Sequence, residues 1–470
     1  MQASGKIRGE QRVLVVGAGV AGLSAALALA KAGFAVEVLE RKPYVGGRAS
    51  SYEHPALGEV VDCQHVLLGC CTNLVYLYKE SGASNMIRWY DELTFMEAGG
   101  RASRIASGPL PAPFHSTLSF LRAPMLGLQD KIGIARGLLR FLPGLPPDSG
   151  ESVENWLRKT RQTERAIRHF WGPVIVGALN DGFAQCSLHY AAQVFRESFL
   201  KSAQGGRLGI PSAPLSELYS AAVEAIEKHG SVIHFRASVD GLAPNADGSW
   251  TAQTPTGEHL ADAVVLALPF EQAHSLMKRL PSVLGSSRLI EMANSFVHSP
   301  ITTVQLWFDR EITGLHHAVL LDATIQWMFN KTLIRGGAAG SASYLELTIS
   351  ASKAQLKMGR EEILKDALRE LALFFPEAGN AKLLKSAVLK EARATFSVLP
   401  GLDPIRPGAQ SPWPGIFLAG DWTATGWPST MEGAARSGFL AAEAVALSAG
   451  EPASFLQDDL PAQGLMSIFG

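Results

Sequence analysis

The sequence predicts an α/β fold in which a domain with a parallel sheet is interrupted by an inserted α+β domain that has a mixed sheet and helices. With 470 residues, the chain is too long for one ordinary hydrophobic core. A strand–helix–strand pattern occupies residues 11–40, and a buried strand and a long helix occupy residues 415–447. Because both segments have the pattern of a parallel sheet, we expect them to form one domain around an insertion.

Residues 11–40 have the order of a βαβ unit. Residues 11–16 are a short valine- and leucine-rich run that ends in glycine, which is typical of a buried parallel strand. Residues 20–32 have the pattern of a buried helix that Gly33 ends, and a second strand follows at residues 36–40. This order predicts a right-handed crossover. Because this strand, turn and helix account for the uncharged N-terminal stretch, we expect neither a signal peptide nor a transmembrane span.

The turn between this strand and helix reads Gly-Ala-Gly-Val-Ala-Gly. Gly17 permits the tight turn, Gly19 lets the backbone approach a pyrophosphate, and Gly22 lets helix and strand pack closely. The helix N-terminus offers free N–H groups to phosphates, and Glu40 is placed to accept hydrogen bonds from ribose hydroxyls. We therefore predict a Rossmann-type dinucleotide site, with a glycine-rich turn that binds nothing as the alternative. The predicted contacts are Gly17, Gly19, Val20, Ala21, Gly22 and Glu40.

The rest of the chain contains further helices and strands without an internal repeat. The last predicted strand leads into Gly420 and Asp421, and a long helix follows. At its start, Ser429 and Glu432 have the spacing of a capping box, with Ser429 as the N-cap. The other predicted helices are residues 216–229 and 360–375, and the other predicted strands are residues 231–235, 263–268, 301–308, 344–349 and 415–419.

Two further motifs distinguish a flavin dinucleotide from a nicotinamide one. Residues 41–48 read Arg-Lys-Pro-Tyr-Val-Gly-Gly-Arg directly after Glu40, and Gly420-Asp421 follows a strand near the C-terminus. These motifs resemble those of the flavin amine oxidase and carotenoid desaturase superfamily. The resemblance implies FAD as cofactor, with Arg48 on the pyrophosphate; a surface salt bridge is the alternative. It also implies FAD contacts for Arg41, Gly46, Gly47, Val239, Gly420, Asp421, Thr430 and Met431, with a core position as the alternative for Val239.

Three segments resemble the hydroxysqualene dehydroxylases, a family within this superfamily. They are residues 62–73, 209–219 and 420–438, and the resemblance extends over most of residues 12–447. It implies reductive removal of the hydroxyl of hydroxysqualene, which gives squalene in hopanoid or triterpenoid biosynthesis. An allylic C–OH ionises when its oxygen is protonated, and reduced flavin then delivers hydride inside an apolar tunnel that excludes water.

The nucleotide-binding segments at both ends of the chain indicate one interrupted domain with a second domain inserted into it. The FAD-binding domain is expected in three parts, and the substrate domain lies between them. The expected boundaries are 1–105, 207–275 and 386–450 for the FAD-binding domain, 106–206 for a helical insertion that faces substrate or membrane, 276–385 for the substrate sheet and helix, and 451–470 for a C-terminal tail.

A group that protonates the leaving oxygen is sought in residues 62–73. His65 has an ordinary pKa of about 6.5 and can therefore act as a general acid, with Gln64 and Asp62 beside it. A histidine fixed in the core by hydrogen bonds is the alternative. Trp427 is predicted to flank the flavin or the substrate, with a rigid loop anchor as the alternative. No metal site is predicted, because no histidine or cysteine spacing indicates one.

Composition limits the partners. The formal net charge of −1 without a long basic run argues against nucleic acid, and four cysteines without a CxxC pair indicate a reduced, cytoplasmic chain. Residues 118–145 combine apolar and basic side chains, so contact with the inner membrane is expected; lid or core helices are the alternative. Since one dinucleotide fingerprint is visible, electrons are expected from another protein or from a transiently bound nicotinamide.

Three other functions are weighed against the dehydroxylase. A carotenoid (phytoene-type) desaturase would use oxidised flavin to accept hydride from a polyene precursor. An amine or porphyrinogen oxidase is less favoured, because the three quoted segments do not indicate either. A prenyl-lipid-binding chaperone of related fold would have no redox cofactor, and the intact fingerprint at both ends of the chain argues against it.

Overall fold

A five-stranded parallel sheet is assembled from three distant parts of the chain. The computed structural model describes residues 11–469. The strand order is β10-β2-β1-β14-β20, and all neighbours are parallel. Strands from both ends of the sequence share this sheet, which confirms the predicted α/β fold. Its strands are β1 (Arg12–Val16), β2 (Ala35–Glu40), β10 (Val232–Phe235), β14 (Ala263–Ala267) and β20 (Ile416–Ala419).

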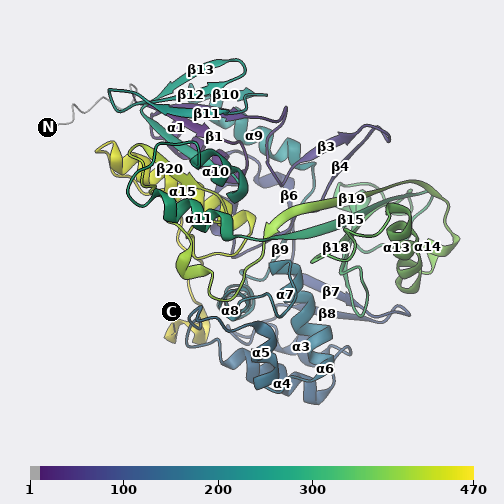
Figure 1. Cartoon of the computed structure of the whole chain (residues 1–470). Helices are drawn as coiled ribbons and strands as arrows, with labels where there is room; N and C mark the ends of the chain where they lie inside the picture. The colour runs from purple at the N-terminus through teal and green to yellow at the C-terminus, as the bar shows by residue number, and fades with distance from the viewer. Residues whose placement is uncertain (1–10, 470) are drawn as a thin grey trace.

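Helices and a small antiparallel sheet cover the five-stranded sheet (Figure 1). α1 and α15 pack so closely that a Cβ atom at Gly438 would lie 2.2 Å from the carbonyl oxygen of Ala21. α2 and α9 pack beside them, and β13 of the small sheet contacts β1. These elements are α1 (Val20–Lys31), α2 (Thr72–Glu80), α9 (Leu215–Glu227), α15 (Met431–Ser448), β11 (Gly241–Pro244), β12 (Trp250–Thr254) and β13 (Gly257–Ala261).

The start of α15 differs from the predicted capping box. The N-cap is Thr430, whose hydroxyl accepts a hydrogen bond from the Gly433 amide at 3.0 Å. The Glu432 carboxylate instead accepts the amides of Asn73 and Leu74 at 3.2 and 2.8 Å, so it caps α2. The Ser429 assignment was wrong because its hydroxyl donates to Asp421 at 2.6 Å.

A seven-stranded mixed sheet forms the second domain. The order is β19-β15-β18-β17-β16-β7-β8, in which the β16–β7 pair is parallel and the other pairs are antiparallel. The long strands β15 and β19 extend from this domain toward the parallel sheet (Figure 1). The elements are β7 (Glu92–Met96), β8 (Ala102–Ala106), β15 (His298–Phe308), β16 (His317–Leu320), β17 (Trp327–Asn330), β18 (Tyr344–Ile349), β19 (Leu383–Phe396), α12 (Lys331–Ile334), α13 (Arg360–Phe374) and α14 (Glu377–Asn380).

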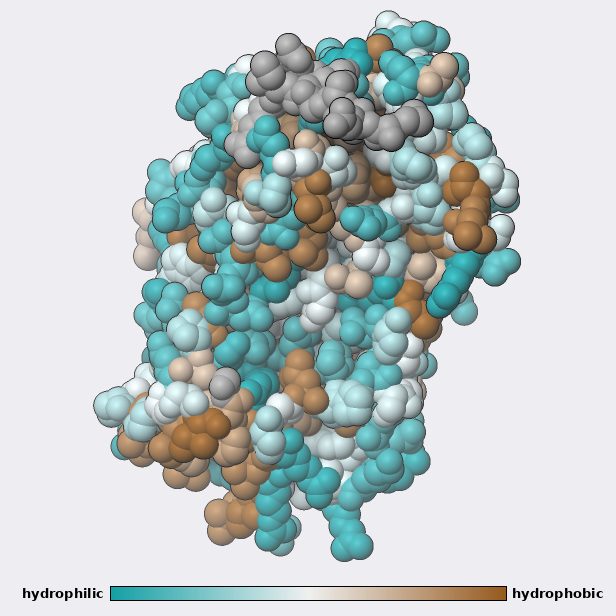
Figure 2. Space-filling view, turned by 90° about the vertical axis from the view of Figure 1, so that its left-hand side faces the viewer, coloured by the Kyte–Doolittle hydropathy of each residue, from teal (hydrophilic) through white to brown (hydrophobic). Residues whose placement is uncertain are grey.

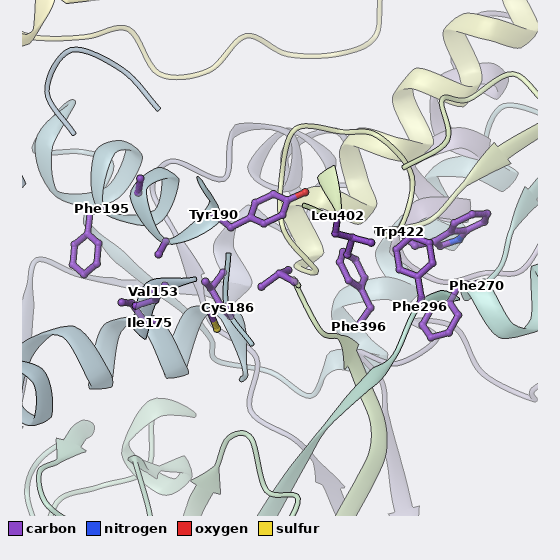
Figure 3. Close-up of a cluster of buried hydrophobic side chains, with 14 of the residues drawn as sticks. Val153, Ile175, Cys186, Tyr190, Phe195, Phe270, Phe296, Phe396, Leu402 and Trp422 are labelled. Carbon is purple, nitrogen blue, oxygen red and sulfur yellow. The ribbon is translucent and has the colours of Figure 1, made fainter. Parts of the chain in front are cut away.

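A helical layer lies beside the seven-stranded sheet, at the lower end of Figure 1. A cluster of buried apolar side chains joins it to the domain of the five-stranded parallel sheet. Figure 3 shows Phe195 and Ile175 at one end, Tyr190 in the middle, and Phe296 and Trp422 at the other end. The layer comprises α3 (Thr117–Arg122), α4 (Leu128–Leu139), α5 (Val153–Lys159), α6 (Glu164–Ala166), the π-helical turns Ile167–Trp171 and Arg196–Leu200, α7 (Gly172–Leu179) and α8 (Leu188–Phe195).

Short elements connect these layers. Within the described range 11–469, no helix is both long and apolar enough to cross a bilayer. The connecting elements are the hairpin β3 (Ser51–His54) and β4 (Glu59–Asp62), the sheet of β5 (Leu67–Leu68), β9 (Leu208–Pro211) and β6 (Ile87–Tyr90), the helices α10 (Phe270–Met277) and α11 (Ser286–Ser295), and the 3₁₀ turns Ser84–Met86, Asp403–Ile405 and Gly464–Ile468.

Candidate cofactor and substrate site

A cavity of about 710 Å³ connects the two sheets. Its volume lies within the range of roughly 300–1,000 Å³ that is usual for ligand and cofactor pockets. One end is lined by Val16, Leu39 and Ala267 at the carboxyl ends of β1, β2 and β14. This edge of an open parallel sheet is where such folds bind their ligands. The cavity therefore begins at a nucleotide-type edge and ends in the second domain.

Two glycine-containing turns lie side by side at the nucleotide end. Gly19 pairs with Gly46, and the Gly46 amide donates to the Ala18 carbonyl at 2.8 Å. A Cβ atom at Gly22 would lie 1.8 Å from the Gly17 carbonyl oxygen, so glycine is required there for packing. At Gly19 the nearest atom to such a Cβ is the Gly47 Cα at 3.8 Å. Gly19 thus leaves space that opens into the cavity, whereas Gly22 shapes the turn.

Glu40 holds these turns together from the end of β2. Its carboxylate accepts the backbone amides of Ala18 and Lys42, each at 2.8 Å. The side chain is 6% exposed, and the residue lines the cavity. The predicted ribose-binding carboxylate is therefore fixed in place beside the nucleotide end.

The structure brings together Arg48 and Asp421, which are 373 positions apart in the sequence. The Arg48 guanidinium forms an ion pair with the Asp421 carboxylate, and it also donates to the Ala394 carbonyl at 3.3 Å. Both residues line the cavity, and Ser429 fixes the other carboxylate oxygen of Asp421. The N-terminal motif with Arg48 and the C-terminal motif with Asp421 thus lie on the same wall of the cavity.

A buried arginine that the sequence did not indicate orders the loop after Asp421. The side chain of Arg406 has no exposed surface. Its guanidinium donates to the carbonyls of Asp421 and Trp427 at 2.7 and 2.6 Å, and it stacks against the ring of Phe396 at 5.5 Å. Because the loop backbone supplies its acceptors, Arg406 sets the path of the chain between β20 and α15.

The far part of the cavity is mainly apolar. It runs between β7, β16 and β17 of the seven-stranded sheet and the helical layer around α7 and α8. The absence of charged side chains from this stretch of wall suits a hydrocarbon chain rather than a small polar ligand. Its lining includes Leu93, Phe95, Val174, Ala178, Val194, Phe199, Leu208, Val319, Trp327 and Phe329.

A buried polar cluster adjoins this cavity. The Lys331 ammonium, on a residue only 2% exposed, donates to Asp62 Oδ1 and to Gln64 Oε1, each at 2.6 Å. Glu346 accepts a hydrogen bond from the backbone amide of Gln64 at 2.5 Å, and the other carboxylate oxygen of Glu346 lies 3.3 Å from Lys331 Nζ. Asp62, Gln64 and His65 line the cavity. The predicted catalytic segment is therefore held by Lys331 and Glu346, which no local spacing in the sequence indicated.

Burial and charge set the protonation of this cluster. Burial raises the pKa of Glu346 to about 7, although the Lys331 ammonium opposes the rise. Burial acts in the same direction on Asp62, but there the attraction of the nearby cations Lys331 and Arg335 together outweighs it, and the pKa of Asp62 is lowered. Asp62 is therefore ionised at neutral pH, whereas Glu346 titrates near neutral pH.

His65 is neutral at neutral pH. Its Nδ1 lies 2.7 Å from the Cys63 carbonyl oxygen, and because a carbonyl can only accept, Nδ1 carries the hydrogen. Burial lowers the pKa of His65. The cationic form that a general acid requires is therefore populated only at pH values below its ordinary range.

The remaining predicted residues divide into two groups. Trp427 is buried, does not appear among the cavity-lining residues, and lies under the Arg436 guanidinium at 4.9 Å from its ring centre. Gly22 also lies behind the wall. The cofactor candidates that line the cavity are Gly17, Gly19, Val20, Ala21, Glu40, Arg41, Gly46, Gly47, Arg48, Val239, Gly420, Asp421, Thr430 and Met431.

Comparisons with known proteins agree with this architecture. The family model "Flavin containing amine oxidoreductase" matches residues 20–446. The 15-cis-phytoene desaturase of Solanum lycopersicum is 27% identical over 92% of this chain and 77% of that protein. The 15-cis-phytoene desaturase of Synechococcus elongatus is also 27% identical, over 92% of this chain and 95% of that protein.

Solved structures share the fold at low identity. An oxidoreductase from Methanosarcina mazei has a TM-score of 0.71 at 19% identity and covers 91% of this chain and 98% of its own. Cyclohexylamine oxidase from Brevibacterium oxydans has a TM-score of 0.63 at 18% identity and covers 94% and 99%, respectively. At these identities the likeness concerns the fold. The glycine turns and the open position at Gly19 fit the flavin cofactor that the description of the family names.

Proposed function

The chain belongs to the flavin-containing amine oxidoreductase family and is an FAD-dependent oxidoreductase, and from this premise we propose that it acts on a long isoprenoid chain. The observation that carries the proposal is the apolar far part of the cavity, which extends from the cofactor motifs between the two domains. A hydrocarbon of this kind offers few polar groups, so its position is set by the shape of the cavity. The apolar walls also exclude water from the reacting carbon.

The residues that would hold FAD lie at the nucleotide end of the cavity. The amides of the glycine turn and of the α1 N-terminus would face the pyrophosphate, and Glu40 the ribose. Arg48 and Asp421 would lie on the flavin side of these groups. When bound, FAD supplies or takes up a hydride at its isoalloxazine ring.

We favour hydroxysqualene as the substrate, with squalene as the product. In this reaction a C–O bond breaks and a C–H bond forms: the carbon gains a hydride and is reduced, while the hydroxyl gains a proton and leaves as water. Reduced FAD is the reductant. The support is the polar cluster of Asp62, Gln64 and His65 on the cavity wall, because a side chain there could form a hydrogen bond with the hydroxyl of hydroxysqualene. The segments around residues 62–73 and 420–438 resemble hydroxysqualene dehydroxylases and point the same way.

Desaturation of a phytoene-type polyene is the second candidate, and the named relatives favour it. The two 15-cis-phytoene desaturases match 92% of this chain. This reaction runs in the oxidative direction: the substrate loses a hydride to oxidised FAD and a proton to a base, and a C=C bond forms. Neutral His65, with the lone pair of its Nε2, is suited to accept such a proton.

Product analysis distinguishes the two reactions. Purified protein with chemically reduced FAD is incubated with hydroxysqualene without oxygen, and the same protein with oxidised FAD is incubated with phytoene. We expect squalene in the first reaction and no new double bond in the second. Desaturated phytoene without squalene would overturn the dehydroxylase assignment, and no turnover of either substrate would overturn the isoprenoid proposal.

The same assay tests His65. If His65 donates the proton, the rate falls as pH rises through its lowered pKa, and His65→Gln reduces turnover by about 10²–10⁴-fold without loss of FAD. The matched control is His229→Gln, because His229 is exposed after α9. Unimpaired turnover in His65→Gln would remove the histidine from the acid role.

We also propose that the helical layer docks on an anionic membrane. Exposed leucine and isoleucine side chains on α3 and α4 are interspersed with basic ones, and the C-terminal 3₁₀ turn extends the patch because the Leu465 amide donates to the Ala112 carbonyl at 2.9 Å. Figure 2 shows apolar side chains gathered at this lower end of the molecule. The exposed apolar residues are Leu118, Leu121, Leu128, Ile132, Leu139, Leu465 and Ile468, and the basic ones are Arg122, Lys131, Arg136 and Arg140.

Vesicle binding tests this surface. In co-sedimentation with phosphatidylglycerol vesicles, the double variant Leu121→Ser/Leu128→Ser is expected to bind at least about tenfold more weakly, because each leucine contributes about 1.5–3 kcal/mol when it leaves water. Leu284→Ser is the control, since Leu284 is fully exposed between α10 and α11. Equal binding of both proteins would exclude the helical layer as the docking surface.

A further inference from the structure

A cluster of two histidines and a glutamate lies outside the cofactor cavity, at one edge of the parallel sheet. Glu37 is on β2, His234 on the edge strand β10, and His259 on β13 of the small antiparallel sheet. Their potential ligand atoms all lie within 4.8 Å of one another. None of the three is among the residues that line the cavity, so the cluster has no part in the reaction proposed above.

Strand register explains why these residues meet. Val232 on β10 is the partner of Glu37 on β2, and His234, two residues later, points to the same face. β13 contacts β1 beside them and brings His259 over this face. Because the three ligands come from three strands and lie up to 222 positions apart, no local spacing reveals them. This explains why the sequence predicts no metal site.

The separations suit one small metal ion. The Glu37 carboxylate oxygen Oε2 lies 2.9 Å from His259 Nδ1 and 3.5 Å from His234 Nε2. Four-coordinate zinc binds nitrogen and oxygen at roughly 2.0–2.2 Å, which places neighbouring ligand atoms about 3.3–3.5 Å apart. The separation between Glu37 and His234 fits this spacing, whereas the ion would replace the hydrogen bond between Glu37 and His259, whose side chains must move slightly apart. Two imidazoles and one carboxylate form a ligand set that zinc uses when one coordination position stays open to water.

We propose that Glu37, His234 and His259 form a binding site for a divalent transition-metal ion of the zinc type. The partial exposure of Glu37 and His234, with side chains 46% and 38% exposed, gives the ion access from solvent. His259 is the anchored ligand, with a side chain 15% exposed. Nitrogen donors favour zinc, nickel or copper over magnesium or calcium.

The bound ion would add a link between two sheets that are already joined where β13 leads into β14 through Asp262, whose amide donates to the Arg12 carbonyl at 2.9 Å. It connects β13 of the antiparallel sheet to β2 and β10 of the parallel sheet. β2 continues from Glu37 to Glu40, whose carboxylate fixes the glycine turn. The ion therefore binds the folded state at a position three residues from the cofactor site, and it raises thermal stability by mass action.

Zinc titration of the FAD-loaded protein, after treatment with a chelator, tests the site. Isothermal calorimetry is expected to show one zinc per chain and a rise in melting temperature that saturates with it. His234→Gln and Glu37→Gln are each expected to raise Kd for zinc at least about tenfold. His229→Gln, which alters a nearby exposed histidine outside the cluster, is expected to leave Kd unchanged.

The outcomes separate the site from incidental binding. His234 and Glu37 are partly exposed, so their variants are expected to keep FAD, and the flavin spectrum reports whether each has folded. If one of them fails to fold, the other provides the comparison. Zinc binding that is absent in the wild type, or equally weakened by His229→Gln, would overturn the proposal.

Discussion

A Gly19→Val protein is expected to fold normally and to purify without flavin. Gly19 has an ordinary extended backbone with φ −76° and ψ 179°, so a side chain causes no strain there. The first added atom meets only the Gly47 Cα at 3.8 Å, and the rest of the valine extends into space that lines the cavity. A branched side chain at this point removes the close approach of phosphate to backbone. We expect FAD occupancy to fall at least about tenfold, which corresponds to about 1.4 kcal/mol of binding free energy.

The measurement is the ratio of flavin absorbance to protein, together with circular dichroism and a melting curve. Gly359→Val is the matched control, because Gly359 lies at the start of α13 with an ordinary backbone and open space around its Cβ position. Gly22→Val is the opposite case: its Cβ would lie 1.8 Å from the Gly17 carbonyl, so the turn itself is expected to fail. Full flavin occupancy in Gly19→Val would place the phosphates elsewhere.

Lys331→Met is expected to cost about 3–5 kcal/mol of unfolding free energy, the usual result of removing one partner from a buried ion pair. The variant leaves Asp62 and Glu346, which are 3% and 0% exposed, without their common cation. It also frees the Gln64 amide oxygen on the cavity wall. We expect turnover to fall as well, because the segment that carries His65 loses its position.

Urea unfolding of the FAD-loaded protein measures this change. The double variant Lys331→Met/Glu346→Gln is expected to recover part of the loss, since it removes one uncompensated carboxylate along with the cation. Lys385→Met serves as the control: Lys385 pairs with Glu59 at the surface, where such pairs contribute about 0–1 kcal/mol. If Lys331→Met were no more destabilising than Lys385→Met, the polar cluster would not carry the structural role assigned to it.

Local patterns in the sequence were sufficient to predict most strands and helices of the parallel-sheet domain. The Val/Leu run before Gly17 and the alanine-rich run after Gly22 became β1 and α1, because short-range sterics and burial act there on neighbouring residues. The cap of α15 was misplaced by one residue. Ser429 and Thr430 both have capping side chains, and only the tertiary bond from Ser429 to Asp421 decides which of them serves the helix.

Part of the candidate site could also be predicted, because some of its residues belong to local motifs. Gly19, Arg48 and Asp421 belong to motifs with recognisable local order, and all three line the cavity. Lys331, Glu346 and Arg406 carry no such motif. Lys331 is 269 positions from Asp62, and only the packing of β4 against the seven-stranded sheet brings them together. Trp427 shows the reverse, since a conspicuous aromatic residue in a motif-rich loop lies behind the wall.

The assembly of the parallel sheet has a consequence for biosynthesis. Its edge strand β20 ends at Ala419, and the Asp421 carboxylate follows directly, so residues 416–421 complete a sheet and a site that residues 12–40 begin. During translation, backbone N–H and C=O groups along one edge of β14 stay unpaired until β20 leaves the ribosome. We therefore expect full cofactor binding only after residue 421 has left the ribosome, and a premature stop before residue 416 is expected to leave an unfinished sheet that chaperones or proteases encounter.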